Sequence, residues 1–179
     1  GIGAQGWLRE IGPDSRVRPV LPGDWRATPL LEAAQALFLS DEDISLEDAP
    51  GALAEWSTHV DLVAFTRGYG GADVCYRGEW RRFGAFSANP VDLTGAGDTF
   101  AGGFLGYLAC AASYKDVSHL KRAMAYGTTM ASFNVQDFST KNIEDLERDV
   151  IDERFHDFAE RMTVPRAEEF LKARRAVTA

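Results

Sequence analysis

The sequence is short of several residue types that would place it in familiar functional classes. It has two cysteines, Cys75 and Cys110, which lie far apart and flank no metal-ligand spacing. This disfavours a disulfide framework, although one disulfide is compatible with the spacing, and it favours a reducing compartment such as the cytoplasm. His59, His119 and His156 show no zinc-ligand spacing, so we interpret them as ordinary surface or packing residues.

Positive charge is also scarce. The chain carries 19 Lys and Arg against 27 Asp and Glu, a formal net charge of -8. Because nucleic acids and anionic membranes attract basic surfaces, this balance disfavours both as partners. The longest apolar run, residues 100–112, is shorter than a bilayer requires and contains three glycines, so no membrane span is predicted.

The composition is otherwise that of a globular chain, 45% hydrophobic and 26% charged over 179 residues. One sizeable core fits this length, so we expect a single domain over residues 1–179. The chain begins without methionine and without a basic-then-apolar leader, so we expect it to be the second half of a longer protein. A sheet cut at that point exposes an edge, and we therefore expect a homo-oligomer or association with a missing N-terminal half.

Apolar runs that end in polar residues predict buried parallel strands. Residues 36–39 lead into Ser40, and residues 60–65 lead into Thr66, with a helix expected between them. Strand, helix, strand, hairpin and then helices predict an α/β fold. The remaining expected elements are short strands at 6–8 and 17–20 joined by a turn at 12–14, a helical turn at 30–35, a helix at 48–59, a hairpin of 72–76 with 80–86, and helices at 98–112, 118–135, 142–162 and 166–176.

Residues 92–100 read D-L-T-G-A-G-D-T-F and run into a small-residue apolar segment of helical character. Gly95, Ala96 and Gly97 let the backbone approach an anion closely, and the following helix adds unpaired amides and the positive end of its dipole. This pattern predicts a phosphate-binding loop. Asp98 is either a helix cap or, beside an anion, a general base. No Gly-Lys-Ser/Thr follows, so the loop is not a Walker A motif.

The pattern D-x-T-G-A-G-D-x-F, from Asp92 to Phe100, resembles the signature of the ribokinase-like sugar kinases, the phosphofructokinase-B family. The resemblance covers roughly residues 37–146, and Gln5-Gly6-Trp7-Leu8-Arg9 is similar to a segment found midway along family members. It implies a three-layer αβα ribokinase-like domain with a largely parallel central sheet, of which this chain would be the C-terminal half.

The resemblance also implies a reaction, transfer of the γ-phosphoryl group of ATP to a hydroxyl of a sugar or nucleoside. Asp98 would take the hydroxyl proton, and the amides of Gly95, Ala96 and Gly97 would hold the developing charge. Mg²⁺ would lie mostly on the phosphates and water. Asp92 and Thr94 match a monovalent-cation site, which would hold K⁺.

Further binding residues follow from the same resemblance. Ser40 and Asp43 match an element that helps to organise the phosphates and the magnesium ion, although Ser-x-x-Asp before a helix is equally a capping box. Thr66, Gly68 and Gly71 match residues at the ATP phosphates and ribose; the alternative is a plain glycine-rich turn into the hairpin.

The helix expected at residues 118–135 matches one that borders the adenine in the resembled family. Gly127 and Ser132 are its matching small residues, and Tyr126 stands where many members have asparagine. Two other functions stay open, a nucleotide-binding module without catalysis and a structural half that needs a partner chain. ATP binding without turnover would identify the first, and a co-purifying partner would identify the second.

Overall fold

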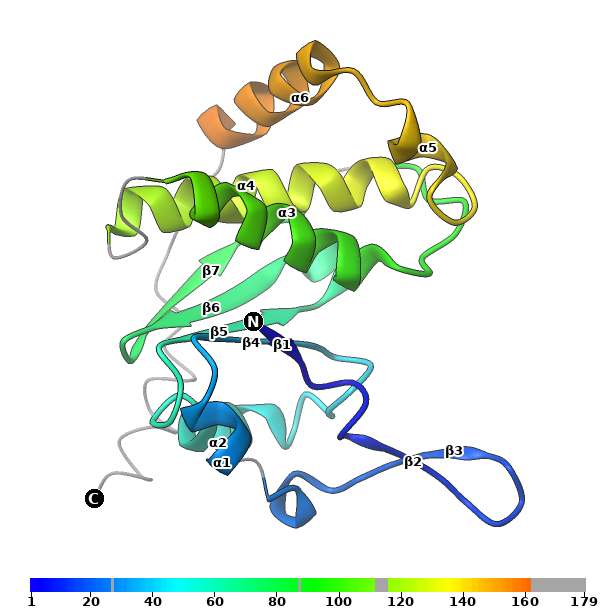
Figure 1. The fold of residues 1–179 in the computed structure, drawn as a ribbon, viewed down its shortest axis with the longest axis vertical. Helices are drawn as coiled ribbons and strands as arrows, with labels where there is room; N and C mark the ends of the chain where they lie inside the picture. Colours follow the sequence, from blue (N-terminus) through cyan, green and yellow to red (C-terminus); the bar gives the residue numbers. More distant parts are fainter. Residues whose placement is uncertain (27, 87, 112–115, 162–179) are drawn as a thin grey trace. The chain divides into compact units, whose positions relative to one another are not determined.

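The computed structural model describes residues 1–26, 28–86, 88–111 and 116–161 (Figure 1). They form two compact units, one from Gly1 to Arg82 and one that begins at Phe83. The expectation of a single domain over residues 1–179 stays a prediction.

A five-stranded sheet of order β1-β4-β5-β6-β7 organises the first unit (Figure 1). β1, β4 and β5 are parallel, and β6 runs antiparallel to β5. The sheet is therefore mixed, and most of its strands are parallel, as we predicted for an α/β fold. The strands are β1 (Ile2–Gly3), β4 (Ala36–Ser40), β5 (Leu62–Thr66), β6 (Ala72–Tyr76) and β7 (Glu79–Phe83). The two-residue β1 was missed because it is too short to show any periodicity.

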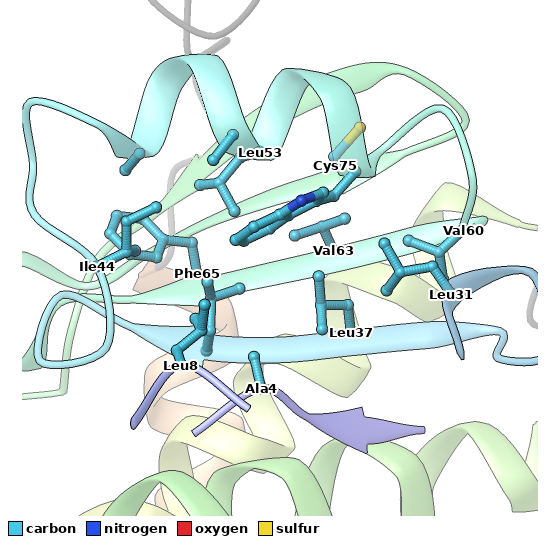
Figure 2. Packing of buried hydrophobic residues seen from close by; sticks show 14 of the residues in the cluster. Ala4, Leu8, Leu31, Leu37, Ile44, Leu53, Val60, Val63, Phe65 and Cys75 are labelled. Carbon is cyan, nitrogen blue, oxygen red and sulfur yellow. The ribbon is translucent and has the colours of Figure 1, made fainter. Parts of the chain in front are cut away.

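One face of this sheet carries the hydrophobic core of the first unit. Leu37 of β4 and Val63 of β5 are register partners, and both are fully buried. α2 (Ala49–Trp56) covers them, and Figure 2 shows Leu53 of this helix above Val63 and Leu37. Pro50 lies in the first turn of α2, where its missing amide costs no hydrogen bond. The helix predicted at residues 48–59 is thus confirmed in a shorter form.

The N-terminal segment forms a small hairpin of β2 (Arg9–Ile11) and β3 (Val17–Pro19). The first strand lies three residues later than the segment 6–8 predicted for it. Leu8 is fully buried in the core, and its amide donates to the Ala4 carbonyl at 3.1 Å, so the chain turns before the strand begins. A 3-10 turn, Pro22–Asp24, and α1 (Thr28–Glu32) complete this region.

The predicted hairpin of β6 and β7 is confirmed, but its turn has two residues instead of the three predicted, because β7 already begins at Glu79. Arg77 and Gly78 both have positive φ angles, 48° and 80°. This conformation matches the right-handed twist of the paired strands.

The second unit is helical (Figure 1). α3 (Ala96–Cys110) and α4 (Val117–Asn134) pack along each other, and α5 (Lys141–Glu144) and α6 (Arg148–Arg161) both pack against α4. The single helix predicted at 142–162 was wrong, because α5 ends after one turn and α6 starts anew. The helix expected at 166–176 lies outside the described residues. Among the described helices, none combines the length and apolarity that crossing a bilayer requires.

The contact between α3 and α4 corrects two expectations for α3. The small residues of this apolar helix predict Gly102 and Gly106 as close-packing positions, but a Cβ atom on either would meet open space. Gly103 makes the close approach instead, since a Cβ there would lie 3.1 Å from the Gly127 Cα atom. Its apolar side chains on nearly all faces also predict burial on most sides, yet within α3 only Phe100 and Phe104 are buried, because one stripe of the helix faces its neighbour.

Gly127 makes the tightest contact in this seam, and it yields a stability prediction. A Cβ atom at Gly127 would lie 2.7 Å from the Phe100 carbonyl oxygen, so Gly127→Ala forces a helix to move. We expect a loss of about 1–3 kcal/mol in the free energy of unfolding. Gly106→Ala, in open space, should instead gain up to about 1 kcal/mol from helix propensity.

Urea unfolding separates these outcomes. All four tryptophans lie in the first unit, whereas the long helices lie in the second, so far-UV circular dichroism chiefly follows the second unit. Equal effects of the two substitutions would contradict the packing described for the α3–α4 seam.

Candidate functional site

The loop before α3 is anchored to the C-terminal end of α4. The amides of Val91 and Asp92 both donate to the Val135 carbonyl, at 2.7 and 3.3 Å. The Asp92 carboxylate then accepts from the Thr94 amide at 3.0 Å, which closes a local turn. This turn delivers the chain to the start of the helix.

Gly95 stands at the N-cap of α3 with φ 79°, a left-handed conformation that favours glycine. The Thr99 amide donates to its carbonyl at 2.9 Å, and the Ala96 amide donates to the Leu93 carbonyl at 3.2 Å. The first-turn amides of a helix have no partner within the helix, and the helix dipole there favours an anion. The Ala96 amide is thus engaged by the loop in this conformation, while that of Gly97 belongs to the open first turn.

Asp98 is the third residue of α3 and is exposed. The interpretation as a helix cap is wrong, because Gly95 occupies that position and the helix begins at Ala96. Asp98 therefore presents a carboxylate within the first turn, beside the amides that an anion would use. The role of Asp98 as a general base stays a prediction.

The electrostatics of the loop keep Asp92 charged. Hydrogen bonds from the Thr94 amide and hydroxyl, and from the Ser139 amide, hold the pKa of Asp92 below its ordinary value of 3.8, against a smaller opposing effect of desolvation. The residue therefore carries a full negative charge at neutral pH.

Asn134, the last residue of α4, is a site residue that sequence reasoning missed. Its side chain is buried, and Nδ2 donates to the Ser139 carbonyl at 2.9 Å. Oδ1 is buried and accepts no hydrogen bond from the described residues. A Cβ atom on Gly95 would lie 3.7 Å from this oxygen, so Asn134 borders the phosphate loop. The available signal was a polar residue at the C-terminal end of an amphipathic helix.

Gly127 and Ser132, predicted to contact the nucleotide, both have packing roles in α4. Gly127 is buried against Phe100 of α3. The Ser132 hydroxyl is buried, donates to the Thr129 carbonyl at 2.7 Å and accepts from Nη1 of Arg154 at 3.0 Å. Burial lowers the pKa of Arg154, whose guanidinium stacks 3.4 Å from the centre of the Phe133 ring. Nucleotide contact at Gly127 and Ser132 stays a prediction.

In the first unit, the loop after β5 is a tight glycine turn. Gly68 and Gly71 have φ angles of 46° and 80°. The Arg67 amide donates to the Gly71 carbonyl at 2.8 Å, and the Gly71 amide donates to the Gly68 carbonyl at 3.1 Å. Thr66 is the last residue of β5, and its hydroxyl lies 3.4 Å from the Leu39 carbonyl. Gly68 is exposed in this turn and Gly71 is buried, and Nη2 of Arg67 donates to the Gly70 carbonyl at 3.3 Å.

Ser40 and Asp43 form a closed turn at the end of β4. The Ser40 amide and hydroxyl donate to Oδ2 of Asp43 at 2.9 and 3.0 Å. Nη2 of Arg9 donates to Oδ1 at 2.9 Å, and Asp43 is 7% exposed. No helix starts here, since α2 begins at Ala49, so the capping-box interpretation was wrong.

Protein donors engage both carboxylate oxygens of Asp43 in this arrangement, and its contact with a magnesium ion stays a prediction. In the described part of the chain, no three His, Cys, Asp or Glu side chains are grouped so that they could hold a metal.

The structure thus assembles the predicted residues in two groups, one in each unit. Ser40 and Thr66 are register partners at the carboxyl ends of parallel strands, with Asp43 bonded to Ser40. Parallel sheets of this class bind ligands at those ends. The second group surrounds the start of α3 and consists of Asp92, Thr94, Gly95, Ala96, Gly97 and Asp98, with Asn134 added by the structure.

The fold is shared with a solved kinase. The structure of a fructokinase from Vibrio cholerae O395, bound to fructose, ADP and a potassium ion, matches with a TM-score of 0.61 and 21% identity. The match covers 71% of this chain and 42% of that one. The predicted α/β ribokinase-like fold is thereby confirmed.

The family is shown by sequence. The chain matches the pfkB family of carbohydrate kinases over residues 29–146, and it belongs to that family. It is 38% identical to a fructokinase of Escherichia coli over 63 residues, which are 35% of this chain and 20% of that protein. It is 42% identical to a cytidine kinase of Thermococcus kodakarensis over 101 residues, which are 55% of this chain and 31% of that protein. The matches therefore span a third or less of these relatives.

The lowered pKa of Asp92 predicts a pH dependence. A depressed pKa contributes stability above the unfolded-state pKa, and that stability is lost as the pH falls through the folded-state pKa. Asp92→Asn should therefore unfold more easily than the wild type at pH 7, and the two proteins should converge as the pH falls from 3.8 through the lowered folded-state pKa. Urea unfolding over a pH series measures this. Asp145→Asn, at an exposed position of the same unit, controls for the loss of charge; a gap for Asp92→Asn that persists in acid would contradict the hydrogen bonds described.

Proposed function

We propose that this chain carries the nucleotide-binding and phosphoryl-transfer part of an ATP-dependent kinase that acts on a hydroxyl group of a sugar or a nucleoside. The observation that carries the proposal is the loop of Gly95, Ala96 and Gly97 at the N-terminus of α3, with exposed Asp98 in the first turn. Membership of the pfkB family and likeness to a fructokinase and a cytidine kinase support the class of acceptor.

Asp98 is the proposed general base. An alcohol hydroxyl is a poor nucleophile at neutral pH, so a carboxylate that accepts its proton lowers the barrier as the phosphoryl group arrives. The amides of the loop and the dipole of α3 stabilise the charge that develops on the transferred group. Gly95 and Gly97 would contribute their backbone amides to this stabilisation. The Ala96 amide would do so after it releases its hydrogen bond to the Leu93 carbonyl.

The nucleotide would lie against the strand ends of the first unit. Thr66, Gly68 and Gly71 form a glycine turn whose backbone suits the phosphates and ribose of ATP. We propose that the small residues Gly127 and Ser132 of α4 border the adenine of the nucleotide, as predicted from the sequence.

A monovalent cation is proposed for the loop of the second unit, at Asp92 and Thr94, as in the prediction from sequence. The buried Oδ1 of Asn134, which accepts no hydrogen bond from the described residues and lies beside Gly95, supports an additional oxygen ligand there. K⁺ would add positive charge behind the phosphate loop when bound, and it would satisfy the buried Asn134 oxygen. Mg²⁺ is proposed to arrive on ATP, held by phosphates and water, because the chain offers it no ready set of ligands among the described residues.

A purely structural or catalytically inactive module is not favoured, because the family signature keeps both its aspartates. The acceptor-binding residues, homo-oligomer formation and association with a further segment belong to the whole protein and remain proposals. We also propose the cytoplasm as its compartment, on the composition alone.

Nucleotide binding is the first test. We expect ATP with Mg²⁺ to shift the amide resonances of Gly68, Gly71 and Gly97 in a ¹⁵N-labelled sample. The reason is that their backbone groups form the two proposed phosphate contacts. Inorganic sulfate at the same ionic strength is the control. A folded chain that shows no shift at millimolar ATP would refute nucleotide binding by this chain.

Catalysis is tested in an active protein that contains this chain. Asp98→Asn keeps the size and polarity of the side chain but removes the proton acceptor. We expect kcat to fall by about 10²–10⁴-fold with little change in ATP affinity. Asp92→Asn should be milder, because its role is to shape the loop or hold a cation. Near-full turnover of Asp98→Asn together with an inactive Asp92→Asn would reverse the two roles.

A further inference from the structure

Arg9 is fixed by contacts on two sides, and the proposed mechanism does not use it. Its Nη2 atom donates to Oδ1 of Asp43 at 2.9 Å, in an ion pair whose acidic partner is buried. The Gln5 amide, turned so that its oxygen faces the guanidinium, accepts from Nη1 at 2.8 Å and from Nη2 at 3.1 Å. A guanidinium has five N–H groups, and these three contacts leave two of them.

The position of Arg9 links it to the strand ends. Asp43 bonds to the Ser40 amide and hydroxyl, and Ser40 is the register partner of Thr66. The Asp41 amide also donates to the Thr66 carbonyl at 3.0 Å. All of these residues lie in the first unit, so Asp43 connects Arg9 directly to the edge proposed for the nucleotide phosphates.

The negative charge at this edge would hinder ATP binding unless a positive charge offset it. Asp41, Glu42 and Asp43 follow β4 in succession, and like charges would repel the polyphosphate of ATP. Arg9 neutralises the buried member of this group while its own side chain stays 31% exposed. Arginine presents a planar fork that binds phosphate oxygens in pairs, which lysine does not.

We propose that Arg9 is a phosphate-binding residue for the nucleotide, and that Asp43 positions Arg9 instead of ligating Mg²⁺. This inference rests on the proposed function, because it names a further contact of the same nucleotide site. It reverses the role that the sequence resemblance implies for Asp43. Both carboxylate oxygens accept hydrogen bonds from protein donors, and a magnesium ion on Asp43 would lie beside the positive guanidinium of Arg9, which would repel it.

The test compares affinities with and without metal. The full 179-residue chain, ¹⁵N-labelled, is titrated with tripolyphosphate in EDTA, with ATP in EDTA and with ATP and Mg²⁺. Arg9→Gln should weaken the affinity for each of these three ligands by about tenfold, the effect of losing one charge-assisted hydrogen bond. Arg9→Lys should recover part of the loss. Asp43→Asn should weaken ATP binding equally with and without Mg²⁺, because the metal does not contact it.

Matched controls come from the exposed end of the same hairpin. Arg18 pairs with Asp14 at 3.1 Å, so Arg18→Gln and Asp14→Asn remove the same charges from another ion pair. Neither should change any of the three affinities. Amide spectra establish that each variant is folded; if Asp43→Asn unfolds the first unit, the Arg9 variants still test the phosphate contact and Mn²⁺ broadening of the wild-type Asp43 amide tests the metal.

The outcomes separate this inference from the proposed function. Shifts at Gly68 and Gly71 with no change at the Arg9 side chain, or a loss confined to the Mg²⁺-dependent affinity in Asp43→Asn, overturn the inference and leave the function standing. Tripolyphosphate shifts at Arg9 without an ATP response at the glycine turn support the anion site and overturn the function. If neither tripolyphosphate nor ATP binds, both the inference and the proposed function are overturned.

Discussion

The parallel pairing of β4 with β5 is the constraint on which the first unit depends. It places Leu37 and Val63 side by side under α2, and the same register brings Ser40 level with Thr66 at the far end. A slip of one residue in β5 would turn Val63 to the face opposite Leu37 and move Thr66 out of line with Ser40. The core and the proposed phosphate edge are therefore specified by one set of hydrogen bonds. The turn of Ser40 and Asp43 and the glycine turn after Thr66 are extensions of that pairing.

In the second unit, a single carbonyl group positions the loop that precedes α3. Val135, just past the end of α4, accepts from two successive amides of the loop that precedes α3. The loop is therefore positioned by the end of one helix and opens into the start of the other. Gly95 makes this connection in a left-handed conformation, and Asn134 fills the space beside it. The residues proposed for chemistry lie on the loop, while the residues that fix their position lie forty residues away in the sequence.

The sequence predicted most elements because their signals are local. The apolar runs of β4 and β5 and the spacing of the D-x-T-G-A-G-D pattern need no tertiary information, and they led to the α/β class and the family. Long-range contacts could not be read in this way. Gly103 was missed in favour of Gly102, because which face of an all-apolar helix is buried depends on its neighbour. Arg9 and Asp43 are 34 positions apart, so their ion pair follows from folding and not from any motif.

The close approach of Gly127 to the Phe100 carbonyl has a consequence for how this family member can change over evolution. Phe100 follows Asp98 by two residues on the same rigid helix. Any larger side chain at Gly127 pushes on the backbone of the turn that carries the proposed base. Adaptation of the helix seam, whether toward heat tolerance or toward a new partner, is therefore tied to reaction geometry, and substitutions on the open side of α3 at Gly102 and Gly106 offer the less constrained route.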